Sequence, residues 1–241
     1  MKKSIIFDLD GCLVESEVLA LKAIANSARD LGAQNISEHE MCSQLLGLKM
    51  SQIGDWVEQK AGRPVPEDFA DRIDAELMAQ YPTELTPVTG AMAVLSFLES
   101  QGFQIALATG SSTARMQLAL KTAGLSRFFE GRACSSDQVA NGKPAPDLFL
   151  LAASLLGRTV GDCLVLEDSP HDVRGAVAAG MSAIGFVGGS HLKSIRDEQS
   201  SKLLDAGCEL VIHDLTDVID LAGDRSTLLH ENSLRSRQVL T

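Results

Sequence analysis

Short apolar runs recur along the chain, and in its second half they alternate with longer amphipathic stretches. Each run is rich in apolar or β-branched residues and predicts a buried strand: Ser4 to Phe7, Gln104 to Ala108, Arg132 to Ser135, Cys163 to Leu166, Ser182 to Val187 and Glu209 to Ile212. Helical periodicity fills 112–123 and 146–156 between them. This alternation predicts an α/β fold with a doubly wound, Rossmann-like parallel sheet.

The segment that follows the first run has a different pattern, because helical stretches fill it and strand-like runs are almost absent. Leu19 and Ala23 lie on one expected helix, and Ile53 and Trp56 lie on another. The simplest account is a small α-helical cap domain inserted after the first strand. The expected boundaries are 1–14 and 88–223 for the core domain, 15–87 for the cap domain and 224–241 for a loose C-terminal tail. Two connections between the domains would allow a hinge.

Composition and charge narrow the possible functions. The 241 residues carry a net charge of −11, so we expect no basic surface for nucleic acid. No apolar stretch approaches the roughly 18 residues of a membrane span. The five cysteines are odd in number and show no zinc-binding spacing, which suits a reducing compartment. We therefore expect a cytoplasmic protein without a nucleic-acid or membrane partner. A monomer is the expected state, since no heptad seam or long exposed apolar run is visible.

Acidic side chains follow two of the predicted strands. Asp8 and Asp10 come directly after the first strand, and Gly11 allows a sharp turn that can aim both carboxylates at one point. Glu167 and Asp168 close another strand at the same edge of the sheet. Such carboxylates repel one another unless a hard, oxygen-binding cation lies among them, so Mg²⁺ is the economical explanation. A solvated turn or a helix cap is the alternative for Asp8 and Asp10 taken alone.

Two further loops could bind an anion. Thr109, Gly110 and Ser111 follow a strand and open a helix, so hydroxyl and backbone N–H groups would meet a phosphate there. Lys143, beside Pro144 in a stiff turn, could neutralise both the carboxylates and an incoming phosphate. An ordinary helix cap and a solvated lysine are the alternatives. Together with the acidic pairs, these groups occupy four successive loops. This combination is a more specific signal for a functional site than any one loop alone.

At these motifs the chain resembles the haloacid dehalogenase superfamily, in particular its phosphatases with a small helical cap after the first strand. The resemblance spans about 4–221 and rests on Asp8-Leu9-Asp10-Gly11-Cys12-Leu13-Val14, Thr109-Gly110-Ser111, Lys143-Pro144 and Glu167-Asp168-Ser169. It implies a phosphatase acting on a small phosphorylated metabolite, either a sugar phosphate or a sugar-acid phosphate. A phosphomutase of the β-phosphoglucomutase type is the alternative, and a non-catalytic binding protein on the same fold is a third.

The resemblance also implies roles for the residues that would meet the phosphate. Asp8 would be the nucleophile that forms an aspartyl-phosphate, and Asp10 would be the general acid and base. Thr109 would bind the transferring phosphoryl oxygens together with the backbone of Gly110 and Ser111. Because dehalogenating relatives lack an acid at the position of Asp10, its presence indicates phosphate ester chemistry.

The same resemblance implies how charge would be balanced at the site. Lys143 would stabilise the charge on both the nucleophile and the phosphate. Mg²⁺ would be held by Asp8, the carbonyl oxygen of Asp10 and Asp168, with Glu167 nearby or acting through water.

Other residues near the motifs have weaker or structural interpretations. Lys49 lies where capped relatives keep a substrate-specificity loop and could meet the substrate when the cap closes, although an exposed helix-end lysine is an equal alternative. Arg115 is a weaker candidate, because a helix in its place commonly presents charge to solvent. His171 is expected at the rim of the site. Ser169 is expected to cap the helix that starts at the next residue, with Asp172 as its capping-box partner.

Cys12 lies inside the first motif, where relatives often carry Thr. Packing explains it better than catalysis, since a thiolate would be disfavoured among carboxylates.

Overall fold

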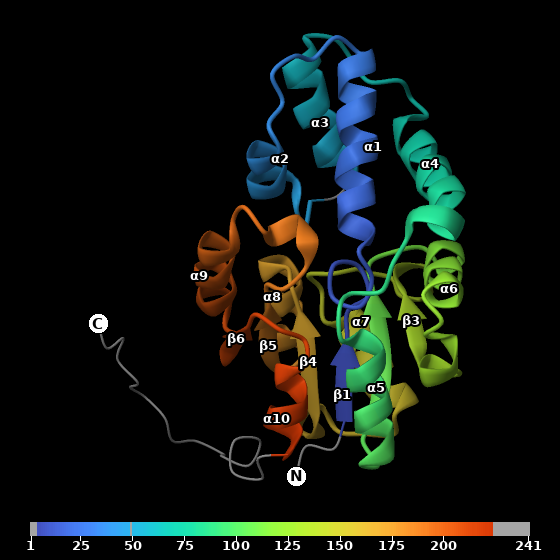
Figure 1. The fold of residues 1–241 in the computed structure, drawn as a ribbon, viewed down its shortest axis with the longest axis vertical. Helices are drawn as coiled ribbons and strands as arrows, with labels where there is room; N and C mark the ends of the chain where they lie inside the picture. The colour runs from blue at the N-terminus through green and yellow to red at the C-terminus, as the bar shows by residue number, and fades with distance from the viewer. Residues whose placement is uncertain (1–3, 49, 224–241) are drawn as a thin grey trace.

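A six-stranded parallel sheet forms the base of the structure, a computed structural model that describes residues 4–48 and 50–223 (Figure 1). The strand order is β3-β2-β1-β4-β5-β6, and every neighbouring pair runs parallel. The strands are β1 (Ser4–Phe7), β2 (Gln104–Thr109), β3 (Ala133–Ser135), β4 (Cys163–Glu167), β5 (Ser182–Phe186) and β6 (Leu210–Ile212). The predicted α/β fold with a doubly wound parallel sheet is therefore confirmed.

Strand β1 lies at the centre of the sheet, between β2 and β4. Phe7 pairs with Leu107 of β2 and with Leu166 of β4, so the three strands end at a similar level. The chain leaves β1 toward β2 and β3 and later returns to β4 on the other side, which makes this boundary the switch point of the sheet. The loops that follow β1, β2 and β4 therefore meet at one edge.

Helices cover both faces of this sheet, which explains why β1 and β4 are buried along their whole length. The helices are α5 (Ala91–Ser100), α6 (Thr113–Thr122), α7 (Asp147–Leu155), α8 (Pro170–Ala178), α9 (Arg196–Ala206) and α10 (Asp217–Gly223). Short 3-10 helices are η1 (Ser126–Phe129), η2 (Ser136–Gln138), η3 (Val160–Asp162) and η4 (Ser190–Leu192). In Figure 1, α5 and α10 contact each other in front of the sheet and α7 lies behind it.

Four helices lie beyond the carboxyl edge of the sheet (Figure 1). They are α1 (Ser16–Asp30), α2 (Glu38–Leu45), α3 (Met50–Ala61) and α4 (Phe69–Glu84), all from the segment expected to form the cap. Helix α1 packs against α3 and α4, and α4 also contacts α6. The two connections to the sheet meet where Val14 forms a bridge with Pro87. The exact domain boundaries stay a prediction.

Two of the sequence expectations fall on parts of the chain that the structure does not describe. Lys49 and the tail expected at 224–241 lie outside the described residues. No helix in the described ranges is long and apolar enough to span a membrane. All five cysteines are buried, and none forms a disulfide.

Candidate active site

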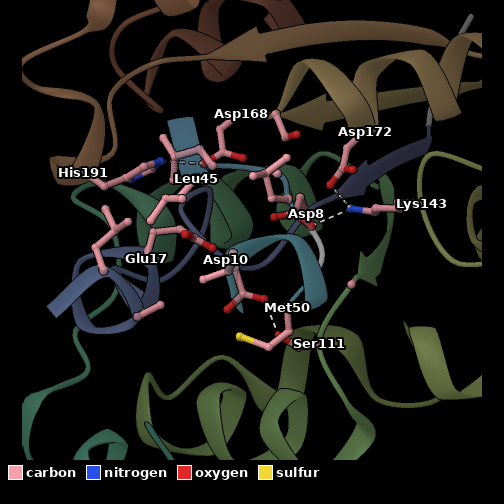
Figure 2. Close-up of a pocket in the computed structure, with 18 of the residues that line it drawn as sticks. Asp8, Asp10, Glu17, Leu45, Met50, Ser111, Lys143, Asp168, Asp172 and His191 are labelled. Atoms are coloured by element: carbon pink, nitrogen blue, oxygen red, sulfur yellow. Dashed lines mark hydrogen bonds and ion pairs between the residues drawn. The ribbon is translucent and has the colours of Figure 1, made fainter. Parts of the chain in front are cut away.

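A cavity of about 470 Å³ lies where the loops after β1, β2 and β4 meet helices α1 to α4. Its base carries charged and hydroxyl side chains, which we call the polar floor: Asp8, Asp10, Ser111, Lys143 and Asp168. Figure 2 shows these side chains pointing toward one another. The polar floor therefore brings together residues that are far apart in the sequence.

Asp8 and Lys143 form the centre of a buried charge cluster. Asp8 directly extends β1, since its N–H donates to the carbonyl of Leu166 at 3.0 Å. Lys143 Nζ lies 2.6 Å from Asp8 Oδ1, 2.5 Å from Glu167 Oε1 and 3.2 Å from Asp172 Oδ2. The side chain of Lys143 is only 4% exposed. One ammonium group is thus shared by three carboxylates.

The electrostatics of this cluster follow from burial and from its excess of negative charge. Burial raises the pKa of Asp8 well above its usual value, and the nearby acids add to this effect against the opposing charge of Lys143. The pKa of Glu167 is raised for the same first reason. Burial alone would lower the pKa of Lys143, but its carboxylate partners raise it well above normal. The lysine is therefore firmly charged, and the carboxyl groups around it outnumber it three to one.

Asp10 lies in a different environment, at the centre of a set of hydrogen-bond donors. The hydroxyl of Ser16 donates to Oδ1 at 2.6 Å, and those of Thr109 and Ser111 donate to Oδ2 at 2.9 and 2.7 Å. Burial acts to raise the pKa of Asp10, but Arg115 and these hydroxyls outweigh it, so the pKa is lowered. The structure therefore holds Asp10 as a carboxylate, which is the form of a base.

Asp168 is held in place by a histidine and by close packing against the first loop. His191 Nε2 lies 3.0 Å from Asp168 Oδ2, and the carbonyl of Asp168 accepts a hydrogen bond from Gln199 at 2.7 Å. Gly11 has a φ of +79°, and a Cβ there would lie 2.1 Å from Asp168 Oδ2. A side chain at Gly11 is therefore excluded both by its conformation and by the approach of Asp168.

Two groups of side chains in the described residues lie close enough to share a metal ion. Ligand atoms of Asp8, Cys12 and Asp168 lie within 4.8 Å of one another, and so do those of Asp8, Glu167 and Asp172. Burial raises the pKa of the Cys12 thiol well above normal, which favours the packing role expected for it. The remaining donors are carboxylate oxygens, and one oxygen of Glu167 has no partner within the described ranges. This donor set fits a hard cation such as Mg²⁺.

Most of the residues singled out in the sequence meet at the cavity, with two exceptions. Gly110 lines the cavity together with the polar floor. Thr109 is completely buried and turns its hydroxyl toward Asp10, so it does not face the cavity as expected. Glu167 is also completely buried and lies against Lys143. The Thr109 hydroxyl was expected to bind an anion, but it donates its hydrogen bond to Asp10 instead.

Two interpretations of neighbouring residues were wrong. Arg115 does not face solvent: it is 18% exposed, donates to Ser111 Oγ at 2.7 Å and lies 3.4 Å from Asp74 Oδ1 of α4. Ser169 precedes α8, but its hydroxyl makes no capping hydrogen bond. Asp172 instead pairs with Lys143, because a buried ammonium attracts it more strongly than a backbone N–H would. Carboxylates in and around the polar floor therefore bind both Arg115 and Lys143.

Sequence reasoning missed Glu17 and His191, which also line the cavity. His191 follows Gly188 and Gly189 after β5, and a Cβ at Gly189 would lie 2.6 Å from the His191 ring. Paired glycines in a strand-end loop were the available signal for a close contact there. Glu17 lies on α1 among other polar positions and carries no comparable signal.

Known proteins and a family model match this chain over most of its length. A family model described as haloacid dehalogenase-like hydrolase matches residues 2–180. Hexitol phosphatase A of Escherichia coli is 31% identical over 76% of this chain and 82% of its own length. A protein of Drosophila melanogaster named "Probable pseudouridine-5'-phosphatase" is 33% identical over 74% and 79%, respectively. The crystal structure of a haloacid dehalogenase-like protein of unknown function from Agrobacterium tumefaciens has a TM-score of 0.82 and 31% identity, covering 92% of this chain and 98% of that one.

Proposed function

Because the chain belongs to the haloacid dehalogenase-like hydrolases, we propose that it is a Mg²⁺-dependent phosphatase of a sugar phosphate or sugar-acid phosphate that works through an aspartyl-phosphate. The family and the phosphatase relatives confirm the broader class, a phosphoric monoester hydrolase. The name of hexitol phosphatase A supports a sugar-like substrate. The observation that carries the proposal is the placement of Asp8 beside Lys143, with Asp10 on the same loop.

In the first step, Asp8 attacks the phosphorus atom of the ester. The oxygen that Lys143 does not hold, Oδ2, forms the new P–O bond, and the bond from phosphorus to the leaving oxygen breaks. Asp10 gives its proton to that oxygen, so an alcohol leaves. Lys143 offsets charge on the nucleophile and on the phosphoryl oxygens throughout.

In the second step, water attacks the phosphorus atom of the aspartyl-phosphate. Asp10 accepts a proton from the water, a new P–O bond forms, and the bond to Asp8 breaks to release inorganic phosphate. Burial acts to raise the pKa of Asp10, but Arg115 and three hydroxyls outweigh it, and the lowered pKa keeps Asp10 in the carboxylate form that can accept this proton. Before the first step Asp10 must take up a proton, which weakens its hydrogen bonds from Ser16 and Ser111.

Asp8 and Asp168 would hold Mg²⁺, together with the carbonyl oxygen of Asp10. When bound, the ion supplies positive charge that neutralises the transferring phosphoryl group. Glu167 would support this site from behind, because its contact with Lys143 fixes the ammonium group next to Asp8. Ser111 and the backbone at Gly110 would contact the phosphoryl oxygens, a role supported by their position in the cavity lining.

The test is phosphate release from a panel of sugar phosphates, sugar-acid phosphates and nucleotides. We expect Mg²⁺-dependent release that a chelator abolishes and added Mg²⁺ restores. Rapid acid quenching should trap a phosphorylated peptide that contains Asp8, detectable by mass spectrometry. Isomer formation faster than phosphate release would assign the protein to the phosphomutases instead. Absence of turnover on every ester would refute the proposal.

A further inference from the structure

We infer that the cavity selects phosphate esters whose leaving alcohol is uncharged and presents an apolar face, and that Glu17 enforces this choice. The inference rests on the proposed phosphatase function and narrows its substrate class, because sugar-acid phosphates and bisphosphates become poor substrates. Three features carry it: the apolar lining contributed by the helices, the pairing of the cations in the described lining, and the carboxylate of Glu17 that faces the polar floor.

Helices α1 to α4 present mainly apolar side chains to the cavity, and we call these the apolar wall. Its members include Leu21, Ile24, Leu45, Met50, Ile53 and Leu77. Figure 2 shows Leu45 and Met50 on the side facing the polar floor. Hydroxyl groups pressed against this wall would lose hydrogen bonds to water without replacement, whereas a C–H face would gain by leaving water. The wall therefore favours a leaving alcohol with one apolar face.

The cations in the described part of the lining are already engaged by carboxylates. Lys143 has three such partners, and Arg115 lies 3.9 Å from Asp10 and 3.4 Å from Asp74. His191 is bound to Asp168. A carboxylate or second phosphate on the leaving group would therefore find no unpaired cation among these residues. It would meet a lining in which acidic side chains outnumber basic ones.

Glu17 is the one charged side chain that α1 to α4 contribute among the described lining residues. No hydrogen bond or ion pair of its carboxylate is found in the described part of the chain, although it faces the floor (Figure 2). Burial raises its pKa to about 7, with Asp10 and Asp168 adding to this and His191 and Arg115 opposing it. Such a carboxyl group can exchange hydrogen bonds with a hydroxyl of the substrate, and its charge repels a substrate carboxylate.

The decisive experiment compares two esters that differ only at the far end of the leaving group. Glucitol 6-phosphate ends in an alcohol where 6-phosphogluconate ends in a carboxylate. We expect kcat/KM to be about tenfold or more higher for glucitol 6-phosphate, mainly through KM. A parallel comparison of 2-deoxyglucose 6-phosphate with glucose 6-phosphate should favour the deoxy compound. Equal or better turnover of 6-phosphogluconate would overturn the inference.

Variants test whether Glu17 causes the preference for an uncharged leaving alcohol. Glu17→Gln should reduce the preference for glucitol 6-phosphate severalfold by improving KM for 6-phosphogluconate. The preference of the unaltered protein should grow as the pH rises and Glu17 loses its proton, and that of Glu17→Gln should stay flat. Glu67→Gln, an exposed glutamate outside the cavity lining, is the matched control and should behave as the unaltered protein. An unchanged preference in Glu17→Gln would remove Glu17 from the inference.

Lys49→Met tests a cation from outside the described residues. If the unaltered protein prefers 6-phosphogluconate and Lys49→Met reverses this preference, the inference is wrong and Lys49 is the specificity residue. Hydrolysis of p-nitrophenyl phosphate serves as the common reference. If it proceeds while the carboxylate ester is preferred, only the inference fails. If no ester is hydrolysed, the proposed function fails and the inference falls with it.

Discussion

The polar floor and the apolar wall enclose the same cavity but are held together in different ways. On the floor, ion pairs and hydrogen bonds at 2.6 to 3.0 Å fix Asp8, Asp10 and Asp168 to partners from other loops. On the wall, apolar side chains of separate helices pack without directional bonds. Directional contacts suit chemistry, because reacting atoms need a fixed geometry, and non-directional packing suits a surface that can vary with the substrate. Floor variants should therefore affect every substrate, whereas wall variants should change the order of preference.

The largest expected effect comes from removing the nucleophile of the floor. Asp8→Asn should lower kcat by at least about 1,000-fold on every ester, because the attacking carboxylate is gone. Its thermal midpoint should not fall, since the raised pKa of Asp8, caused first by burial, shows that the buried charge is disfavoured in the fold. Steady-state kinetics and thermal unfolding measure the two outcomes. Substrate-dependent losses would contradict the assignment of Asp8 to the chemistry.

Lys143→Met should come next, because it removes the cation that three carboxylates share. We expect kcat to fall about 100- to 1,000-fold and the free energy of unfolding to fall by about 3 to 5 kcal/mol at neutral pH. Part of that stability should return at acid pH, where the orphaned carboxylates take up protons. Urea unfolding at two pH values checks this. Lys121→Met, a lysine exposed in the last turn of α6, is a matched control.

His191→Phe should act on the metal rather than on the chemistry, because it leaves Asp168 without its ring N–H donor. We expect the Mg²⁺ concentration for half-maximal activity to rise about 10- to 100-fold. The Mg²⁺ concentration that produces half of the increase in thermal midpoint should rise by the same factor, which gives a readout independent of turnover. His191→Gln keeps a donor and should recover part of the loss. His213→Phe, at an exposed histidine, should show no shift.

The smallest expected effect comes from removing the carboxyl group of Glu17, which lies on α1 beside the apolar wall. The pKa of Glu17 rises to about 7 through burial, so the folded protein holds a proton that the unfolded chain releases above about pH 4.5. The free energy of unfolding therefore falls as pH rises through this window. Glu17→Gln removes that fall and should be more stable than the unaltered protein by about 1 to 3 kcal/mol at pH 8, but not at pH 4. Urea unfolding measures the difference, and a gap that does not vary with pH would contradict it.

The fold and much of the floor could be predicted because apolar runs reveal strands, and parallel strands end at one edge. That rule brings Asp8 and Asp168 to one edge of the sheet, whereas Lys143 was singled out by its stiff proline turn and the roles of all three came from the resemblance to the family. The partners that each side chain chooses do not follow. Whether Thr109 gives its hydroxyl to an anion or to Asp10 depends on a competition in three dimensions.

Site residues that lie on helices are harder to predict from the sequence than those in strand-end loops. Arg115 occupies the first turn of α6, where solvent is the usual direction, and it turns inward because Asp74 of α4 and Ser111 flank it. Glu17 is one polar residue among several on α1, and only the position of that helix over the sheet brings it to the cavity. Periodicity predicts which face of a helix is apolar but not which polar residue meets another element.

The single lysine shared by Asp8, Glu167 and Asp172 has a consequence for the order of events in solution. The floor holds more negative than positive charge, so it repels a phosphate dianion and attracts a cation. A cation and a phosphate ester that occupy it together would each strengthen the binding of the other by the same factor, as thermodynamic reciprocity requires. Substrate affinity would then be a function of free Mg²⁺ concentration, and the supply of the ion would set how strongly the enzyme competes for its ester.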